Sequence, residues 1–250
     1  MLTNPPETGA CRTLSADDRA RVQNAQPGSL TGLDCPICRN RGYVFKAVNG
    51  AVVACECRCM PKRRSIRRIN ESGLADLLEV MTFDRYETPE PWQKTAKAAA
   101  MDYAENGDGH WFMATGNPGT GKSHLCTAIA GALMDRGRDM RYMLWRGDSV
   151  RLKALITDAG SYQEEMRRLK AVQVLYIDDF LKGKVTEADV NLAFELLSDR
   201  YNRRHAATII SSEKSVEEIL DIDEALGSRI YERCKGYLVR TGRQNWRLRK

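Results

Sequence analysis

The sequence predicts an α/β fold, a parallel sheet covered by helices, with a small cysteine-rich module on its N-terminal side. From residue 111 onward, short runs typical of strands alternate with helical stretches, which favours a parallel sheet buried on both faces. Five of the eight cysteines lie between residues 35 and 60, which sets that segment apart. At 250 residues the chain is long enough for one ordinary domain and a smaller appendage.

Composition narrows the functional classes. Hydrophobic residues make up 42% of the chain and charged residues 29%, which excludes a disordered or a membrane protein. The longest uncharged apolar run, residues 125–134, is too short to span a bilayer. The N-terminus lacks the basic stretch and the apolar stretch of a secretory signal, so we expect a cytoplasmic protein without a membrane partner.

Basic residues form two clusters despite a modest net charge of +6. One cluster lies at residues 62–68 and the other at residues 243–250. Each cluster could meet phosphate groups or an acidic partner, and each could equally be a solvated surface.

Composition shifts divide the chain into four segments. Residues 1–34 show no sustained apolar period, so we expect a flexible leader with at most one short helix. Residues 35–62 hold the cysteine cluster, and residues 63–92 show a helical pattern and then prolines, as a connecting helix and linker would. Residues 93–250 form the main domain, which begins with an alanine-rich helix.

The main domain contains the alternating elements. The predicted strands are 111–115, 140–145, 172–177 and 207–211. A long helix precedes the last strand, and its apolar stripe consists of Val190, Ala193, Phe194, Leu197 and Tyr201. Two capping boxes indicate helix starts, one at Thr186 with Asp189 and one at Ser215 with Glu218.

A glycine-rich loop lies between the first predicted strand and a helix. Its pattern, Gly116-x4-Gly121-Lys122-Ser123, is that of a P-loop, whose glycines let backbone N–H groups surround a polyphosphate. Lys122 would reach the β- and γ-phosphates of ATP, and the Ser123 hydroxyl would bind Mg²⁺. The predicted nucleotide-binding residues are Gly116, Asn117, Pro118, Gly119, Thr120, Gly121, Lys122, Ser123 and His124. A glycine-rich turn without a ligand is the alternative.

Two acids, Asp178 and Asp179, follow the strand at 172–177, where a P-loop protein needs them. Asp178 is expected to hold Mg²⁺ through water, and Asp179 to orient the attacking water. Many ATPases of this kind have glutamate at the position of Asp179. The aspartate side chain is one methylene shorter than that of glutamate, so we expect slow hydrolysis of ATP to ADP and phosphate. An ordinary turn at the end of a strand is the alternative.

Polar residues also follow the next strand and occupy a later helix. Ser211, Ser212 and Glu213 end the strand at 207–211, beside the expected position of the γ-phosphate, where a polar side chain can sense it. Arg229 and Arg233 share one helix face, and either could reach the γ-phosphate of a neighbouring subunit. Taken alone, each arginine is better explained as a surface residue.

The cysteine segment has the spacing of a metal site. Four thiolates suit tetrahedral zinc in a closed structural site, which would fold a module too small to have a core. The pattern is Cys35-x2-Cys38 followed by Cys55-x-Cys57-x-Cys59, one cysteine more than zinc needs. Reactive or unliganded thiols are the alternative. The remaining cysteines, Cys11, Cys126 and Cys234, are isolated and are expected to be small buried or surface residues.

In this order and spacing, the motifs resemble bacterial and phage replicative-helicase loaders of the DnaC/DnaI type. The resemblance covers residues 35–250. Beside the P-loop and the acid-ending strand, it rests on CPICRNRGY, CRCMPKRRSIRRI, TFDRYET and ALGSRIYERCKGY, which are most similar to the phage and prophage branch. It implies a P-loop AAA+ core and an N-terminal zinc-binding module. Only 39 residues follow Ser211, too few for the full helical lid of larger AAA+ proteins.

The resemblance also implies roles for single residues. By their spacing to KRRS, the zinc ligands would be Cys35, Cys38, Cys57 and Cys59, with Cys55 as the spare, although Cys55 could replace Cys57 or Cys59. Matching positions make Asp178 the Walker B acid, Ser212 a nucleotide sensor and Arg229 an arginine finger, beside Lys122 and Asp179 in catalysis. Whether Arg247 is a second sensor stays open.

As a function, the resemblance implies an ATP-dependent loader. Its zinc module would bind a hexameric DnaB-type replicative helicase, and its ATPase domain would self-associate through bound ATP and place the helicase on single-stranded DNA. Hydrolysis, stimulated by DNA or partner, would release the loader. The alternatives are an IstB-type transposition ATPase, which generally lacks such a cysteine module, and a nucleotide-gated adaptor with little turnover.

The loop after the acids is a candidate DNA contact. It contains Phe180, Lys182 and Lys184, and in an AAA+ ring this loop can face the central channel. The lysines would then neutralise phosphates and Phe180 would stack on a base. In the equally weighted alternative, Phe180 belongs to the core and the lysines only solvate a turn.

Overall fold

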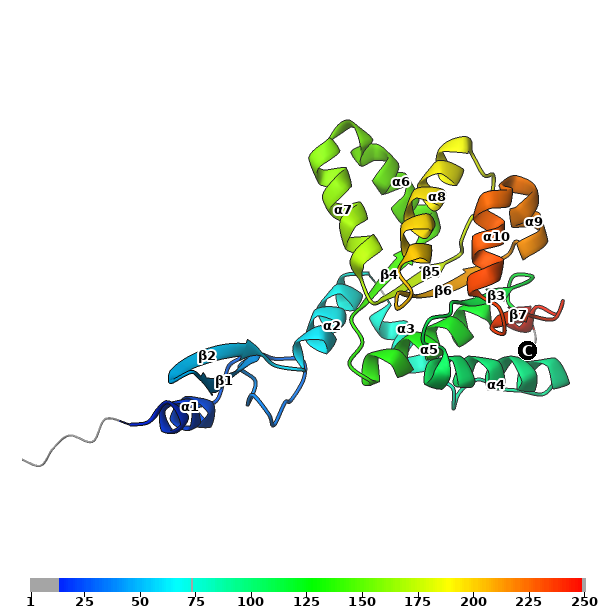
Figure 1. The fold of residues 1–250 in the computed structure, drawn as a ribbon. Coiled ribbons are helices and arrows are strands. Elements are labelled where there is room, and N and C mark those ends of the chain that lie inside the picture. The colour runs from blue at the N-terminus through cyan, green and yellow to red at the C-terminus, as the bar shows by residue number, and fades with distance from the viewer. Residues whose placement is uncertain (1–13, 73, 249–250) are drawn as a thin grey trace, which may run out of the picture. The chain divides into compact units, whose positions relative to one another are not determined.

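The computed structural model describes residues 14–72 and 74–248 and divides the chain into two compact units, Met1–Arg63 and Arg64–Lys250 (Figure 1). Each unit has its own β-sheet. Among the described residues, no helix combines the length and apolar character needed to cross a membrane.

The smaller unit is built on an antiparallel hairpin. β1 (Tyr43–Val48) pairs with β2 (Ala51–Glu56), and Val48 lies opposite Ala51. The turn residues Asn49 and Gly50 both have positive φ. This is the type I′ turn whose twist matches that of the strands, and Asn-Gly is its preferred sequence.

Part of the segment expected to be a flexible leader forms a helix, α1 (Ala16–Ala25). The Ser15 side chain accepts a hydrogen bond from the Asp18 N–H at 3.1 Å and so caps the helix. Near the other end, the Asn24 amide donates to the Phe45 carbonyl and accepts from the Phe45 N–H, each at 2.8 Å. These two bonds hold α1 against β1. Cys11 lies outside the described residues.

The larger unit contains a five-stranded parallel sheet in the order β4-β5-β6-β3-β7. The strands are β3 (Phe112–Thr115), β4 (Met140–Leu144), β5 (Val174–Asp178), β6 (Ala207–Ser212) and β7 (Leu238–Arg240). β3 to β6 confirm the four predicted strands, whereas the short edge strand β7 was not predicted. The predicted α/β fold with a parallel sheet is therefore confirmed.

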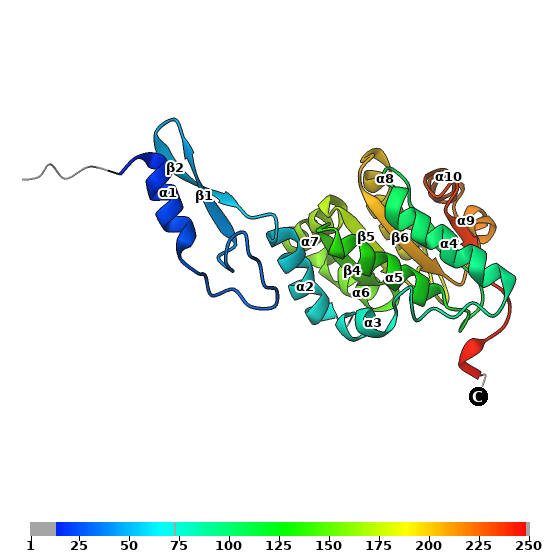
Figure 2. The same cartoon turned by 90° about the horizontal axis from the view of Figure 1, so that it is seen from below.

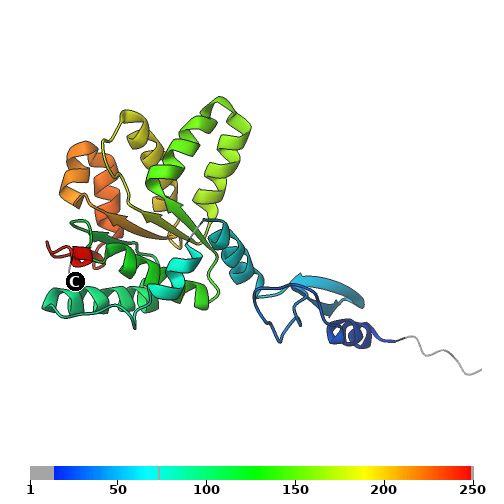
Figure 3. The ribbon, with the colours of Figure 1, turned by 180° about the vertical axis from the view of Figure 1, so that it is seen from behind.

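Helices cover both faces of this sheet. They are α2 (Met60–Ser72), which begins in the smaller unit, α3 (Ala75–Val80), α4 (Pro91–Asn106), α5 (Lys122–Asp135), α6 (Trp145–Ala154), α7 (Ala159–Ala171), α8 (Glu187–Asn202), α9 (Val216–Ile222) and α10 (Glu224–Arg233), with 3₁₀ turns η1 (Leu155–Thr157) and η2 (Trp246–Leu248). In Figure 1, α6 to α10 lie on one face and α3, α4 and α5 on the other. Figure 2 shows the second face, and Figure 3 shows α6 and α7 as an antiparallel pair.

Successive side chains of the strands pack alternately into two separate hydrophobic cores. On β5, Leu175 and Ile177 join the core under α6 to α10, whereas Val174 and Tyr176 join the core under α3, α4 and α5. All four side chains are fully buried, as an inner strand of a sheet covered on both faces requires. Phe194 departs from the predicted stripe of α8, because 36% of it is exposed.

Helix starts follow the predicted caps. Thr186 with Asp189 and Ser215 with Glu218 form capping boxes at α8 and α9. After β6, the described chain continues with α9, α10, β7 and η2.

A buried arginine fixes the end of α7. Arg200 of α8 is fully buried, and its guanidinium donates to the carbonyls of Leu169, Lys170 and Val172 at 2.8–3.2 Å and to the Thr208 hydroxyl at 3.0 Å. Burial lowers the pKa of Arg200 to about 9, so the side chain remains charged at neutral pH. Carbonyl groups at the helix C-terminus thereby receive the donors that they lack within the helix.

Candidate functional site

The P-loop connects the carboxyl end of β3 to the start of α5. Gly116, Gly119 and Gly121 have positive φ, so glycine is required for this backbone path. Gly121 is the N-cap of α5, and its carbonyl accepts the first helical bond from Leu125 at 3.1 Å. The loop therefore ends at a helix N-terminus, where free N–H groups and the helix dipole favour an anion.

Lys122 lies buried beneath this loop, with 6% of its surface exposed. Its ammonium donates to the Asn117 carbonyl at 2.7 Å, which holds the side chain along the loop. Burial lowers the pKa of Lys122, while the nearby acids Glu213 and Asp179 raise it. The arrangement is that of a cation which gains a counter-ion when a phosphate enters.

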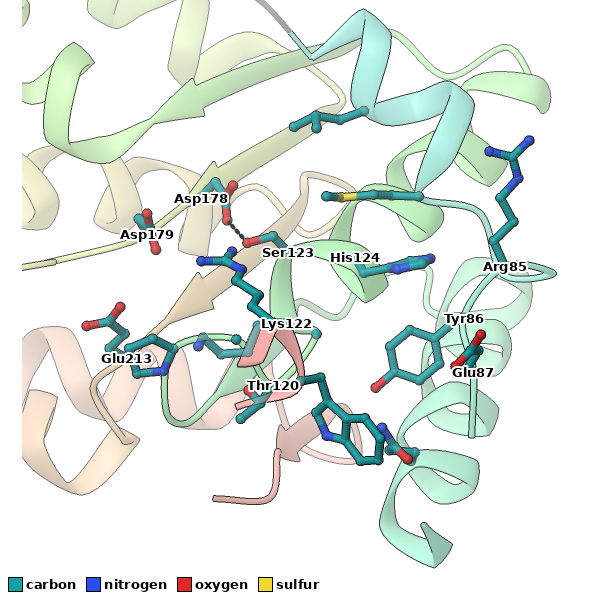
Figure 4. Close-up of a pocket in the computed structure, with 18 of the residues that line it drawn as sticks. Arg85, Tyr86, Glu87, Thr120, Lys122, Ser123, His124, Asp178, Asp179 and Glu213 are labelled. Carbon is teal, nitrogen blue, oxygen red and sulfur yellow. Dashed lines mark hydrogen bonds between the residues drawn. The ribbon is translucent and has the colours of Figure 1, made fainter. Parts of the chain in front are cut away.

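Ser123 and Asp178 meet at the same end of the sheet, as Figure 4 shows. The Ser123 hydroxyl donates to Asp178 Oδ1 at 2.9 Å, and the Tyr142 hydroxyl donates to Asp178 Oδ2 at 3.2 Å. Ser211 also donates to Asp178. A hydroxyl and a carboxylate are hard oxygen ligands of the kind that Mg²⁺ prefers, so these two residues fit the predicted magnesium site.

Asp179 and Glu213 lie together on the far side of Lys122 from Tyr86 (Figure 4). Asp179 has a φ of +55°, and its N–H donates to the Ser211 hydroxyl at 3.0 Å. Both carboxylates line the pocket that also contains Lys122 and Ser123. A carboxylate that lines a pocket beside the P-loop lysine is suited to orient water toward a γ-phosphate.

A pocket of about 570 Å³ joins these groups to a second wall. The wall was not predicted, and it consists of Leu77, Met81, Arg85, Tyr86, Glu87 and Gln93 with Trp246 and Arg247. Tyr86 is 5% exposed, and among the described residues its hydroxyl has no hydrogen-bond partner. The apolar and aromatic side chains of this wall, Leu77, Met81, Tyr86 and Trp246, suit a nucleobase beside the P-loop. Arg85, Tyr86 and Glu87 belong to the TFDRYET segment, one of the segments on which the family resemblance rests. This segment is distant from the P-loop in the sequence and lies beside it only in the fold.

The structure separates the other predicted nucleotide-binding residues. Pro118 to His124 line the pocket, and the His124 ring meets the Tyr86 ring edge-on at 5.1 Å. Gly116 and Asn117 shape the loop without lining the pocket. Ser212 is not brought to the pocket: it is fully buried, and its hydroxyl donates to the Phe180 carbonyl at 2.7 Å. Glu213, the next residue, takes the position expected for Ser212.

The two helix arginines also lie outside the pocket lining. Arg229 lies over the rings of Phe194 and Tyr201, with its guanidinium carbon 5.1 and 5.7 Å from the ring centroids. Arg233 lies over Trp111 at 5.5 Å. Neither can serve the pocket of its own chain, so any role at a γ-phosphate would require a second subunit.

The C-terminal segment contacts the P-loop. The backbone N–H of Trp246 donates to the Gly119 carbonyl at 2.9 Å, and the Thr241 hydroxyl lies 2.6 Å from that of Thr120. Arg247, the possible second sensor, lines the pocket.

For the loop after β5, the structure agrees with the alternative in which Phe180 belongs to the core. Phe180 is fully buried and packs edge-on against Trp145 at 4.9 Å, so it cannot stack on a base. Lys182 forms ion pairs with Asp179 and Glu213 and lines the nucleotide pocket, so its side chain is directed to that pocket. Lys184 is exposed.

In the smaller unit, the sulfur atoms of Cys35, Cys38, Cys57 and Cys59 all lie within 4.8 Å of one another. The Cys35–Cys57 and Cys38–Cys59 sulfur distances are 3.9 and 3.6 Å. A tetrahedral zinc with Zn–S bonds of about 2.3 Å requires sulfurs about 3.8 Å apart, so the four residues fit the ion. Cys55 lies outside the cluster, as do the fully buried Cys126 and Cys234.

Backbone and side-chain donors support the sulfur cluster. The Gly42 N–H donates to Cys38 Sγ at 3.3 Å. Burial raises the pKa of the Cys38 thiol, but this hydrogen bond and those with neighbouring thiols outweigh it and lower the pKa to about 6. Burial and the neighbouring thiols raise the pKa of Cys59 to about 12. Without a cation the cluster cannot hold four thiolates, and a bound zinc would remove that repulsion.

Comparisons with known proteins agree with this geometry. A parallel sheet with a P-loop and an acid at the end of a neighbouring strand is typical of P-loop ATP-binding domains. The family model described as IstB-like ATP binding protein matches residues 39–250, and the chain belongs to this family. The Bacillus subtilis (strain 168) phage-like element PBSX protein XkdC is 31% identical over 220 residues, which are 82% of this chain and 81% of XkdC.

The relatives include replicative helicase loaders. The replicative helicase loader DnaC of Escherichia coli (strain K12) is 28% identical over 193 residues, 76% of each chain. A crystal structure of the DnaC helicase loader superposes with a TM-score of 0.60 at 24% identity, covering 67% of this chain and all of that one. A crystal structure of DnaI gives a TM-score of 0.54 at 17% identity, covering 67% and 92%. The last two similarities show a common fold.

Proposed function

We propose that the chain is an ATP-dependent loader that binds a DnaB-type replicative helicase and places it on single-stranded DNA. One observation carries the proposal: a phosphate and magnesium site and a four-cysteine module occur together in a chain that is similar to DnaC over three quarters of its length. In this proposal ATP is the substrate, and Mg²⁺ and Zn²⁺ are the metal ions.

The pocket residues account for ATP hydrolysis in the proposal. Lys122 and the N–H groups of the P-loop bind the phosphates, while Ser123 and Asp178 hold hydrated Mg²⁺. Asp179 orients the attacking water, and its short side chain makes the reaction slow. Arg229 of one subunit stabilises the transferring phosphoryl group bound to the next, which makes hydrolysis depend on self-association.

The four-cysteine module acts as the helicase-binding part. With zinc bound, its four thiolates leave no open coordination position, so its role is to present a folded surface rather than to catalyse. Helicase binding by this module and nucleotide binding by the larger unit are separable functions of one chain.

The proposal is tested with the full chain, Zn²⁺, Mg²⁺, ATP and the replicative helicase of the host. We expect co-elution of chain and helicase, and transfer of the helicase onto circular single-stranded DNA, measured as unwinding of an annealed strand. Lys122→Ala should abolish transfer while preserving co-elution. Failure of the wild-type chain to co-elute with the helicase and to promote unwinding would contradict the proposal.

A transposition helper ATPase is the second candidate, favoured by the description of the matching family model. Such a protein would bind a transposase and duplex DNA and would have no use for the helicase. The four-cysteine module favours the loader.

A nucleotide-gated adaptor is distinguished by multiple-turnover phosphate release, which in an adaptor stays near background with single-stranded DNA and helicase present.

A further inference from the structure

A lysine ion pair lies at the phosphate end of the nucleotide pocket. The Lys182 ammonium lies 3.1 Å from Asp179 Oδ2 and 3.0 Å from Glu213 Oε1. The two acids follow adjacent strands, β5 and β6, and all three side chains line the pocket. Lys182 thus joins two strand ends at the place where the proposed hydrolysis occurs.

The loop that carries Lys182 is anchored. Phe180 is fully buried, its N–H donates to the Ser211 carbonyl at 2.8 Å, and its own carbonyl accepts from Ser212. The Lys182 N–H donates to the Asp179 carbonyl at 3.1 Å, closing a turn. Since these bonds fix the loop backbone, the side chain of Lys182 is directed to the pocket by the fold and is not a mobile surface lysine.

An ammonium has three N–H donors. Within the described part of the chain, the carboxylates of Asp179 and Glu213 take two of them, which leaves one for a ligand in the pocket. The charges of the same three side chains act on Lys122. Burial lowers the pKa of Lys122, Glu213 and Asp179 raise it, and Lys182 lowers it. The two lysines and two acids therefore belong to one electrostatic site.

We propose that Lys182 binds the γ-phosphate of ATP through its remaining N–H, and so makes this loop the part of the site that distinguishes ATP from ADP. The inference rests on the proposed ATPase function. Asp179, which orients water in that proposal, is ion-paired to the same ammonium. Binding of the γ-phosphate by Lys182 would consequently position Asp179 next to the phosphorus that water attacks.

The test compares two lysines of one loop in the full chain with Zn²⁺ and Mg²⁺. Affinities for ADP and for the non-hydrolysable analogue AMP-PNP are measured by calorimetry. Lys182→Met should weaken AMP-PNP binding about 10-fold or more and change ADP binding by less than about 2-fold, because a hydrogen bond between charged groups is lost only with the triphosphate. The control Lys184→Met, at an exposed lysine two residues on, should change neither affinity. An unchanged ratio of the two affinities in Lys182→Met would overturn the inference.

Two further variants separate direct contact from mere charge neutralisation. If Lys182 only neutralises the acids, adding Glu213→Gln to Lys182→Met should restore the wild-type ratio, and that result would also overturn the inference. With a direct contact, AMP-PNP binding stays weak in the double variant. Lys182→Arg, which keeps the charge, should retain most of the preference for the analogue. A wild-type chain that bound neither nucleotide would contradict the proposed function as well, whereas a wild-type preference that survives in Lys182→Met contradicts this inference alone.

Discussion

The two units of the chain are stabilised by different means. In the smaller unit the only hydrophobic cluster among the described residues is formed by the four cysteines, with Leu33, Val44 and Met60 packed against them. In the larger unit, two extensive apolar cores lie on either face of a sheet whose inner strand β5 is fully buried. Burial of apolar surface, at about 25 cal/mol per Å², stabilises the larger unit and contributes little in the smaller unit. One chain therefore combines a fold that depends on metal with a fold that depends on its core.

Metal removal should give the largest difference between the units. With zinc removed by a chelator, or in Cys38→Ser, we expect residues 14–63 to unfold while the larger unit stays folded, because a structural zinc site contributes on the order of 10 kcal/mol or more. Hydrogen exchange, read separately for each unit, measures this. Protection of the hairpin β1–β2 in the zinc-free chain would show that the module does not need the metal.

A core substitution should act on the larger unit alone. Arg200→Met leaves several buried carbonyl groups without donors, so we expect a loss of about 2–4 kcal/mol in the free energy of unfolding of that unit. Urea denaturation followed by the fluorescence of Trp111 and Trp145 reports it. The matched control is Arg203→Met: Arg203 is half exposed and pairs with Asp199 on the same helix, so its loss should cost about 0.5 kcal/mol or less. Equal effects of the two variants would refute the structural role of Arg200.

Substitutions in the site should change function with little effect on either fold. Lys122→Ala should weaken nucleotide binding about 10-fold to 100-fold.

Arg229→Ala should leave nucleotide affinity within about 2-fold but reduce stimulated hydrolysis about 10³-fold, as loss of an arginine finger does. Its contacts with Phe194 and Tyr201 predict a stability cost of only about 1 kcal/mol.

Mixing these two variants tests whether Arg229 acts in a neighbouring subunit. A Lys122→Ala subunit supplies an intact arginine to an Arg229→Ala subunit that can bind ATP, so phosphate release should partly recover. No recovery, with mixed assembly demonstrated by cross-linking, would leave Arg233 as the next candidate.

The smallest effect should come from the spare cysteine. Cys55→Ser removes a thiol outside the sulfur cluster and should change neither the zinc content nor the stability of the smaller unit, within about 0.5 kcal/mol. The same substitution at Cys57, two residues on, should abolish zinc binding. Zinc content by mass spectrometry decides between the two, and loss of zinc in Cys55→Ser would reassign the ligand set.

Local sequence signals predicted more of the fold than of the site. The strands at the P-loop and at Asp178 were predictable, because their residues carry the required pattern within a few positions. Ser212 was predicted as the sensor, yet Glu213 lines the pocket instead, because neighbouring side chains of a strand point to opposite faces and only the folded backbone shows which one faces the pocket. Tyr86 and Arg247 are far in sequence from the P-loop and reach it only through the fold, and Phe180 follows acids at a strand end, where burial and exposure are both common.

The left-handed backbone at Asp179 limits which acids this position of the chain accepts. Aspartate is several-fold enriched at positive φ because its short polar side chain bonds locally, whereas a longer acid has no such compensation. In the proposed mechanism, Asp179→Glu would therefore bring the carboxylate closer to the attacking water. The same substitution would destabilise the loop by roughly 1 kcal/mol. In the proposed ATPase, Asp179→Glu would therefore need a second substitution that relaxes the loop before the longer acid could act without this cost.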